Sequence, residues 1–191
     1  MTPWRNDLQS DLRRLDELSL RRSIVTLETG QEPHVFLQRR RYTLFTSNNY
    51  LGLSTHSEVI EASIEATRAY GTSVSSSRLL CGSTPLHEEL EARLAALKSQ
   101  EACLLFSSGY LANLGLMTAF LDSGDVIFSD RLNHRSLIDA CRLSRATTVV
   151  YDHLDVDDLI EKMRQHSPSR RRMIVTDGVF SMDGDLAPLD E

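Results

Sequence analysis

Residues 125–177 read DVIFSDRLNHRSLIDACRLSRATTVVYDHLDVDDLIEKMRQHSPSRRRMIVTD, and this stretch decides the fold. It contains three apolar runs that predict strands, at residues 125–130, 146–151 and 172–177, and two amphipathic segments that predict helices, at 136–144 and 155–166. Apolar strands that alternate with helices are typical of a mainly parallel sheet covered on both faces. The stretch therefore predicts an α/β protein with three layers, α/β/α, in which the sheet lies between two layers of helices.

The same alternation continues on the N-terminal side of this stretch. The apolar run ACLLFS predicts a further strand at residues 102–107. Amphipathic segments predict three more helices, at residues 56–71, 85–97 and 110–121. We therefore expect the α/β pattern to begin well before residue 125.

The first 50 residues have a different character. Residues 2–20 predict an amphipathic helix that begins at Thr2-Pro3, and residues 34–47 have the β-branched and aromatic content of two short strands. We expect two parts, an N-terminal helical arm with a short β-hairpin over residues 1–50, and a larger α/β domain over residues 51–191.

Charge and composition exclude several classes of partner. The formal net charge is −6, which argues against nucleic acid or an anionic membrane surface as the main partner. Two arginine clusters, at residues 39–41 and 170–172, oppose that balance, and we expect them to be solvated faces or local phosphate contacts. The three cysteines are far apart in sequence, which favours free thiols in a reducing cytosol. With a charged N-terminus and no long apolar run, we expect a cytoplasmic protein with no membrane span.

A serine- and glycine-rich turn comes just before the predicted helix at residues 110–121. Ser108 and Gly109 lie between an apolar run and that helix, and Tyr110 adds an aromatic face. Free backbone N–H groups and the positive end of the helix dipole suit a phosphate at such a turn. The same residues are also common in turns that bind nothing, so both interpretations stay open on this evidence.

Two further loops carry polar side chains. His134 lies just before the helix at 136–144, where an imidazole can stack on a flat ring, relay a proton, or simply cap the helix. Residues 181–185 (SMDGD) have the composition of an Asx-type turn. Asp183 and Asp185 lack the further ligands of a calcium loop, and we expect no metal site. All three loops follow successive strands, so they should meet at one edge of the sheet.

Four ordered motifs resemble those of the α-oxoamine synthases, which are pyridoxal-phosphate (PLP) enzymes of the fold-type-I aminotransferase superfamily. They are SNNYLGLS (47–54), LLFSSGYLAN (104–113), SDRLNHRSLIDACRLSRA (129–146) and VTDGVFSMDGDLAPL (175–189). Within that family they resemble the branch that makes 8-amino-7-oxononanoate in biotin biosynthesis. The resemblance covers nearly the whole chain and implies the large PLP-binding domain of that fold.

The resemblance implies roles for individual residues. Ser108, Gly109 and Tyr110 match the segment that holds the cofactor phosphate and lines its pocket, and His134 matches the histidine that stacks on the pyridine ring and contacts substrate. Ser181 matches a serine that hydrogen-bonds the cofactor.

Two substrate-binding residues are implied on the N-terminal side. Asn48 matches an active-site asparagine, and Arg21 matches by position an arginine assigned to the acyl substrate. Arg22 is adjacent to Arg21, so this second match rests on a segment without a strong motif.

One stretch departs from the biotin branch. That branch has a G-x-G-x-x-G-S-R motif where this chain reads GTSVSSSR (71–78), with Ser73 and Ser76 in place of two glycines. Serine adopts positive φ less readily than glycine. The departure bears on the acyl substrate more than on the class of reaction, because relatives outside the biotin branch have serines there.

The residues that complete the chemistry of the family do not match any part of this chain. The Schiff-base lysine and the aspartate at the pyridine nitrogen both lie downstream of the FSMDGD loop in the family. The two lysines here, Lys98 and Lys162, lie in segments that predict ordinary solvated helices. We therefore expect the N-terminal half of an enzyme, with the large domain truncated and inactive by itself.

For the complete protein, the resemblance implies a PLP-dependent acyltransferase. It would condense an amino acid, L-alanine in the biotin branch, with an acyl-CoA or acyl-carrier-protein thioester, with loss of CO2, and would act as a homodimer. Two alternatives stay open: another α-oxoamine synthase, such as a glycine-using 2-amino-3-ketobutyrate ligase or a long-chain acyl relative, and a non-catalytic half of a split or decayed enzyme.

Overall fold

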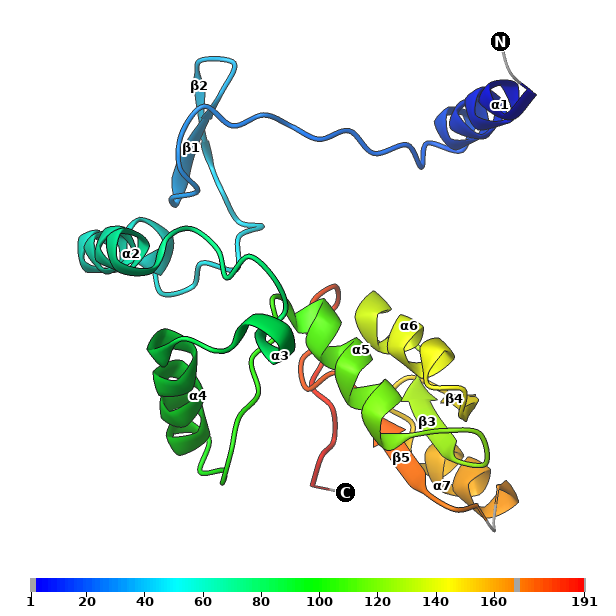
Figure 1. The fold of residues 1–191 in the computed structure, drawn as a ribbon. Helices are drawn as coiled ribbons and strands as arrows, with labels where there is room; N and C mark the ends of the chain where they lie inside the picture. Colours follow the sequence, from blue (N-terminus) through cyan, green and yellow to red (C-terminus); the bar gives the residue numbers. More distant parts are fainter. Residues whose placement is uncertain (1–2, 167–168, 191) are drawn as a thin grey trace. The chain divides into compact units, whose positions relative to one another are not determined.

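The computed structural model describes residues 3–166 and 169–190. It divides into two compact units, Met1–Gly82 and Ser83–Glu191, each of which is described by itself. The predicted boundary at residue 50 concerns the domains of a complete enzyme and stays a prediction. Elements of the two units are labelled in Figure 1.

The first unit contains an N-terminal helix, a β-hairpin, a short 3₁₀ helix and two further α-helices. In order they are α1 (Pro3–Glu17), β1 (His34–Leu37), β2 (Arg40–Thr43), the 3₁₀ helix η1 (Leu53–Thr55), α2 (Ser57–Tyr70) and α3 (Arg78–Cys81). β1 and β2 pair antiparallel with Val35 opposite Tyr42, so the predicted hairpin is confirmed. Gly71 ends α2 with a positive φ, as expected of a helix-terminating glycine. The predicted start at Thr2 lies outside the described residues.

The serine-rich stretch after α2 keeps a single residue in the left-handed region. Neither Ser73 nor Ser76 has a positive φ, whereas Ser75 between them has a φ of 62°. The Ser73 hydroxyl accepts a hydrogen bond from the N–H of Ser75 at 2.9 Å. The two serines at the departing positions are therefore compatible with their backbone conformation, and the strain lies at their neighbour.

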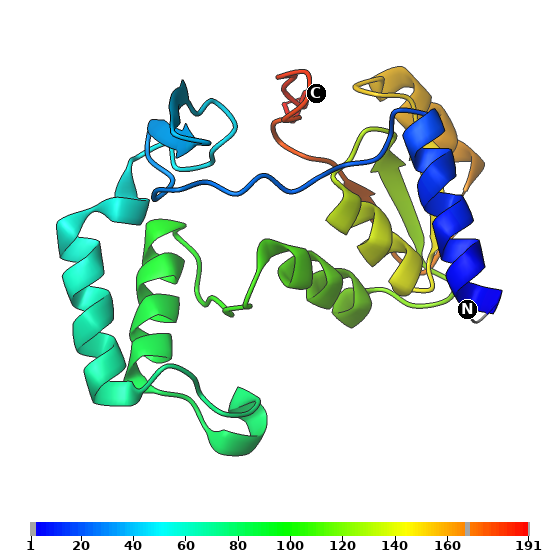
Figure 2. The ribbon, with the colours of Figure 1, turned by 90° about the horizontal axis from the view of Figure 1, so that it is seen from above.

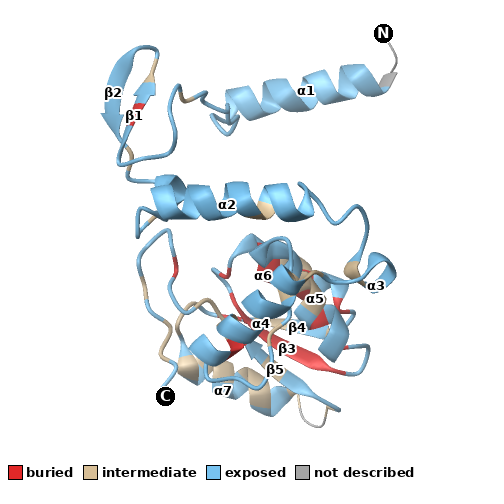
Figure 3. Ribbon diagram, turned by 60° about the vertical axis from the view of Figure 1, so that its left-hand side comes forward, coloured by how far each residue is buried: buried red, intermediate tan, exposed pale blue. Residues whose placement is uncertain are grey.

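The second unit contains the α/β pattern. Its elements are α4 (Pro85–Leu97), α5 (Gly109–Phe120), β3 (Val126–Asp130), α6 (Arg135–Leu143), β4 (Thr147–Tyr151), α7 (Val156–Gln165) and β5 (Arg172–Val175). The strands form one parallel sheet in the order β4-β3-β5. β3 is central, and all five of its residues are buried (Figure 3). Central position and burial on both faces explain why this strand is apolar at consecutive positions.

Helices cover both faces of this sheet, so the predicted three-layer architecture is confirmed. On one face Ile127 packs with residues of α5, its C-cap and α6, namely Met117, Leu121, Leu137, Ala140 and Cys141. On the other face Val126 and Phe128 pack with Tyr151 and with Leu159 and Met163 of α7. Figure 2 shows β3 between α6 on one side and α7 on the other. Alternate residues of one strand thus belong to two separate cores.

The predicted strand at residues 102–107 was wrong. This segment forms no strand, and its apolar residues Leu104 and Phe106 are exposed. A strand needs a neighbour to accept and donate its backbone hydrogen bonds, and within the described residues this segment pairs with no other strand. Within this apolar run, the N–H of Leu105 donates to Glu91 Oε1, at 2.9 Å.

Two arginines of the cluster at 170–172 make hydrogen bonds within the second unit. Arg170 donates two hydrogen bonds to the buried carboxylate of Asp125, at 2.9 and 2.6 Å, and this pairing lowers the pKa of Asp125. Arg171 donates to the carbonyl oxygen of Phe120 at 2.6 Å, at the C-terminal end of α5. These side chains therefore join the start of β5 to the loop before β3 and to a helix terminus, where a cation is favourable.

Two other expectations concern free thiols and membrane-spanning helices. Cys81 is exposed, Cys141 is buried, and all three cysteines are free thiols. Over residues 3–166 and 169–190, no helix is both long and apolar enough to cross a bilayer.

Arg145 follows α6 in a left-handed conformation, with a φ of 66°. This conformation costs about 1 kcal/mol for a residue with a Cβ, whereas glycine adopts it freely. We expect Arg145→Gly to raise the free energy of unfolding by about 0.5–1 kcal/mol, measured by urea denaturation. Arg145→Ala keeps the Cβ and serves as the control, with little gain expected. A larger gain in the alanine variant would show that the charge, not the backbone, is the source of the effect.

Candidate functional site

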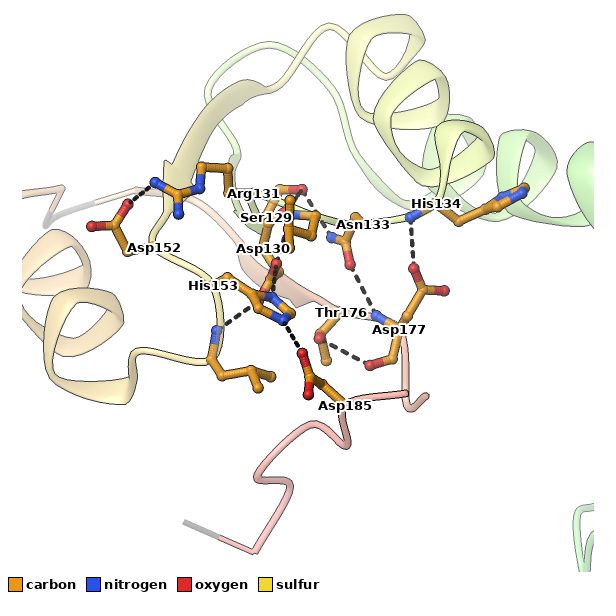
Figure 4. A network of polar contacts seen from close by, with 12 residues as sticks. Ser129, Asp130, Arg131, Asn133, His134, Asp152, His153, Thr176, Asp177 and Asp185 are labelled. Carbon is orange, nitrogen blue, oxygen red and sulfur yellow. Dashed lines mark hydrogen bonds and ion pairs between the residues drawn. The ribbon is translucent and has the colours of Figure 1, made fainter. Parts of the chain in front are cut away.

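The candidate site lies where the strands of the second unit end. Asn133, in the loop after β3, is buried and holds the ends of β3 and β5 together (Figure 4). Its Nδ2 donates to the carbonyl oxygen of Val175 at 2.7 Å and to the hydroxyl of Ser129 at 3.0 Å. Its Oδ1 accepts the N–H of Asp177 at 2.9 Å. One amide side chain thereby fixes the spacing of two loops that are about 40 residues apart in sequence.

Asp177 connects this edge to His134. Its Oδ2 accepts the backbone N–H of His134 at 2.6 Å. His134 is the N-cap of α6, and its Nδ1 lies 3.3 Å from the N–H of Ser136, from which it accepts, and 2.7 Å from the hydroxyl of Ser136. The capping role that the sequence left open is therefore real. It uses only Nδ1, so Nε2 and the exposed ring remain available, and the ring points away from the network (Figure 4).

A chain of polar contacts continues from α6 to α5. Asn113 Nδ2 donates to the hydroxyl of Ser136 at 2.9 Å, and the Tyr110 hydroxyl donates to Asp139 Oδ2 at 2.5 Å. The two helices thus start close together. Tyr110 lies in the first turn of α5, and His134 is the N-cap of α6. This packing places Tyr110 and His134, two site residues expected from the sequence, at the starts of two neighbouring helices.

Ser108 and Gly109 form the start of α5. Ser108 is the N-cap, and its Oγ accepts the N–H of Leu111 at 3.2 Å. Apart from its chain neighbours and its own helix backbone, a Cβ added at Gly109 would meet no heavy atom within 4 Å, so the space beside this Cα is open. The first N–H groups of an α-helix have no acceptor within the helix. An exposed helix start with open approach and a hydroxyl beside it can accommodate an anionic oxygen.

The contact between Tyr110 and Asp139 shifts the pKa of both side chains. The hydrogen bond to Asp139 raises the pKa of the Tyr110 hydroxyl. Arg135 and then Tyr110 lower the pKa of Asp139 by donating to it, and the Arg135 Nε donates at 2.8 Å. The ionised carboxylate of Asp139 therefore keeps Tyr110 protonated and fixes the direction of its ring.

Asp139→Asn tests this arrangement. An amide removes the negative charge, so we expect the pKa of Tyr110 to fall toward its ordinary value. The measurement is the alkaline titration of Tyr110, followed by phenolate absorbance and assigned with Tyr110→Phe. Asp152→Asn is the matched control, since that carboxylate pairs with Arg131 and should leave the Tyr110 titration unchanged. An unchanged titration in the Asp139 variant would contradict the contact.

Ser181 lies on a tight turn after β5. Within this turn the N–H of Gly184 donates to the carbonyl oxygen of Phe180, and the N–H of Phe180 donates to that of Asp185, both at 2.8 Å. Gly184 has a φ of 81°, which explains the glycine at that position. Ser181 is exposed on this turn, at the same end of the sheet as Asp177.

Arg21 and Asn48 belong to the first unit, so their part in a site stays a prediction. Arg21 pairs with Asp16 at 2.8 Å, and both side chains are exposed. Asn48 is exposed as well, whereas its neighbour Asn49 holds the local turn by bonding the hydroxyl of Ser54 at 2.7 Å. Of the two adjacent asparagines, Asn49 thus has a local structural role, and the role of Asn48 stays a prediction.

Sequence reasoning missed several residues of this edge: Asp130, Asn133, Asp139, His153 and Asp177. Asp130 ends β3, and Asp177 comes two residues after β5. The position of these two polar residues, at or just after the ends of buried parallel strands, could therefore have identified them as site residues. Nothing in the spacing revealed Asn133, because its partners are distant in sequence. Among the described residues, no group of three or more His, Cys, Asp or Glu side chains could hold a metal ion.

Comparison with known proteins connects this geometry to a family. Residues 40–191 match the family model "Aminotransferase class I and II". The chain is 48% identical over 179 residues to an 8-amino-7-oxononanoate synthase of Lysinibacillus sphaericus, covering 94% of this chain and 46% of the relative. It is 46% identical to 8-amino-7-oxononanoate synthase 2 of Bacillus subtilis, covering 96% of this chain and 47% of that relative.

The chain also matches solved structures of a serine palmitoyltransferase and an 8-amino-7-oxononanoate synthase. A serine palmitoyltransferase of Sphingomonas wittichii matches with a TM-score of 0.86 at 30% identity, over 96% of this chain and 46% of that one. An 8-amino-7-oxononanoate synthase of Francisella tularensis matches with a TM-score of 0.65 at 29% identity, over 76% of this chain and 40% of that one. The chain spans about half the length of the curated relatives it matches.

Proposed function

The chain belongs to the class I and II aminotransferase family, and from this premise we propose that it is the N-terminal half of a PLP-dependent acyltransferase related to 8-amino-7-oxononanoate synthase. The observation that carries the proposal is the 48% identity to such an enzyme over 94% of this chain. The complete protein would join L-alanine to a pimeloyl thioester, carried by CoA or an acyl-carrier protein, with loss of CO2.

The donors at the sheet edge fit the phosphate end of PLP. The Ser108 hydroxyl and the first N–H groups of α5 would hold the phosphate, with nothing in front of Gly109 to exclude it. The exposed ring of His134 would lie against the pyridine, held in place through its Nδ1 and by Asp177. Ser181 would add a hydroxyl hydrogen bond. When bound, PLP supplies electron withdrawal that weakens the bonds at the α-carbon of an amino acid.

Neither lysine of this chain is placed to react with the cofactor. Lys98 follows α4 as its C-cap, and Lys162 on α7 donates to Asp158 at 2.6 Å. We propose that the reactive lysine and the acid beside the pyridine nitrogen belong to the part of the relatives that this chain does not match. Arg21 and Asn48 would then act on the substrate in the assembled enzyme.

A second candidate is a synthase for a longer acyl chain. The match to a serine palmitoyltransferase structure at a TM-score of 0.86 favours it, as do the serines at Ser73 and Ser76. Sequence identity is 48% to the Lysinibacillus sphaericus 8-amino-7-oxononanoate synthase and 30% to this serine palmitoyltransferase, which is why the former candidate comes first. A non-catalytic half of a split enzyme is the third possibility, and the same experiment addresses it.

The experiment pairs this chain with the C-terminal half of the Lysinibacillus sphaericus relative in one expression host. We expect an amino ketone from L-alanine and a pimeloyl thioester, and much less product from glycine, or from L-serine with palmitoyl-CoA. His134→Ala in the same pair should reduce turnover strongly. The relative split at the same point is the positive control. If that control is active and the hybrid yields product only from L-serine and palmitoyl-CoA, the second candidate replaces the first.

The assembled enzyme is expected to be a homodimer. On α1, Leu8, Leu12 and Leu15 recur on one face and are exposed, which suits packing against another chain. Sedimentation of the assembled hybrid should give the mass of two copies of each half. A fully active species with one copy of each would contradict this expectation.

A further inference from the structure

His153 lies between two carboxylates that come from different parts of the second unit. It follows β4, and its side chain is 14% exposed. Nδ1 is 2.8 Å from Oδ1 of Asp130, whose side chain is 1% exposed, and Nε2 is 3.3 Å from Oδ2 of Asp185, whose side chain is 43% exposed. Figure 4 shows the imidazole between the end of β3 and the turn that follows β5.

This geometry requires a proton on each ring nitrogen. An ionised carboxylate can only accept hydrogen bonds, so each nitrogen that faces one must carry an N–H to donate. Asp130 is also committed to accepting, because its Oδ1 takes the N–H of Leu132 at 2.8 Å and its Oδ2 takes that of Leu154 at 3.0 Å. A neutral imidazole has one N–H and can satisfy only one of the two carboxylates.

An aromatic ring and further acidic side chains lie around this imidazole. Phe180 packs edge-on against it with centroids 4.4 Å apart, and the ring contacts no second aromatic residue among those described. From the start of α7, Asp155 and Asp157 line the same hollow as His153, with the Asp155 carboxylate engaged by the N–H of Asp158. In the loop after β4, Asp152 precedes His153 in sequence and pairs with Arg131 at 3.0 Å.

We propose that His153 is a positioning residue: as an imidazolium it joins Asp130 at the end of the sheet to Asp185, and so holds the turn 180–185 that carries Ser181. Its importance for catalysis rests on the proposed function, in which Ser181 contacts the cofactor. The link itself does not, because it is made entirely by residues of this chain. When the ring loses a proton, the weaker and more exposed contact to Asp185 is the one that breaks.

The sign of the pH dependence follows. The hydrogen bond to Asp130, and secondly that to Asp185, raises the pKa of His153 above its ordinary value of 6.5. A raised pKa in the folded state means that the stabilisation is complete below about 6.5 and is lost as the pH rises through the folded pKa. The turn should therefore be most firmly held in mildly acidic solution and should loosen toward alkaline pH.

The experiment measures amide hydrogen-exchange protection in the purified 191-residue chain over this pH range, without PLP. The reporters are the amides of Phe180 and Gly184, whose hydrogen bonds close the turn. We expect their protection factors to fall by about twofold to fivefold as His153 deprotonates, in keeping with a partly exposed ion pair. The amide of Ile127 in the buried central strand reports on the whole fold and should keep its protection.

Two variants and a matched control make the test specific. His153→Gln and Asp185→Asn should each remove the pH dependence at the turn, and Asp185→Asn should also lower the pKa of His153 in an NMR titration. Asp183→Asn removes an acid from the same turn that is not in contact with the ring, and should behave as wild type. A pH dependence that survives in Asp185→Asn, or turn protection that is flat with pH in the wild type, would overturn the proposal.

The outcome separates this proposal from the proposed function. If the turn responds to His153 but the hybrid enzyme makes no amino ketone, the link stands and the functional assignment fails. If the hybrid is active and the turn does not respond, Ser181 is positioned by other means.

Discussion

Replacing Phe128 by alanine should lower the free energy of unfolding of the second unit by about 3–5 kcal/mol. Phe128 lies in the middle of the central strand and is 0% exposed. It packs with Val126 and Tyr151 against α7, so the substitution leaves a cavity between the sheet and a helix that cannot close without moving either. The loss is a large part of the stability of a small domain, and we expect partial unfolding at room temperature.

Urea denaturation followed by far-ultraviolet circular dichroism measures this loss. Phe45→Ala is the matched control, because Phe45 is 90% exposed and its removal should change stability by less than about 0.5 kcal/mol. If both substitutions destabilised the chain equally, the two-sided core described around β3 would be wrong.

Gly109→Ala should weaken PLP binding by about tenfold while leaving the fold intact. The new Cβ meets no protein atom within 4 Å, and alanine is a better helix former than glycine, so stability should be unchanged or slightly higher. The same methyl group would occupy the space through which a phosphate approaches the first N–H groups of α5. Losing a hydrogen bond to a charged group has an effect of this size.

The measurement is a PLP titration of the purified chain, followed by the NMR shifts of the backbone amides at position 109 and at Tyr110. We expect weak, reversible binding in the wild type, and no stable product on borohydride reduction, because Lys98 and Lys162 lie elsewhere. His134→Ala serves as a comparison, since it should weaken binding through lost stacking without disturbing the shift of Gly109. Equal affinity in wild type and Gly109→Ala would exclude this turn as the phosphate site. Specific reduction onto either lysine would show that the chain holds its own nucleophile.

Much of the architecture was predictable from the sequence. The three strands of the sheet and the helices around them follow from short apolar runs that alternate with amphipathic segments, and each was found within a few residues of its expected position. The starts of α5 and α6 were also predictable from the sequence, and the structure shows that Ser108 and His134 are the N-caps of these helices. These are local properties, set by side chains within about one turn of each other in sequence.

Residues 102–107 show where this reasoning fails. ACLLFS has the composition of a buried strand, but composition supplies only one side of a pairing. Whether a strand forms depends on a second strand to complete its hydrogen bonds, and none pairs with this segment in the described part of the chain. The stretch with Ser73 and Ser76 is a second example, because the sequence does not indicate that its positive φ lies at Ser75, between the two positions that differ from the biotin branch.

The sequence by itself thus determined the class of fold, the positions of the three strands and the turns that begin α5 and α6. Only the tertiary structure decided what those turns face. Asn133 bonds a carbonyl 42 residues away, Asp177 accepts the N–H of His134, and His153 joins the carboxylate at the end of β3 to one on the turn after β5. The physical reason is that a hydrogen bond depends on distance and direction in space. Sequence periodicity encodes which face of an element is buried, and carries no record of which polar groups from other elements meet at its end.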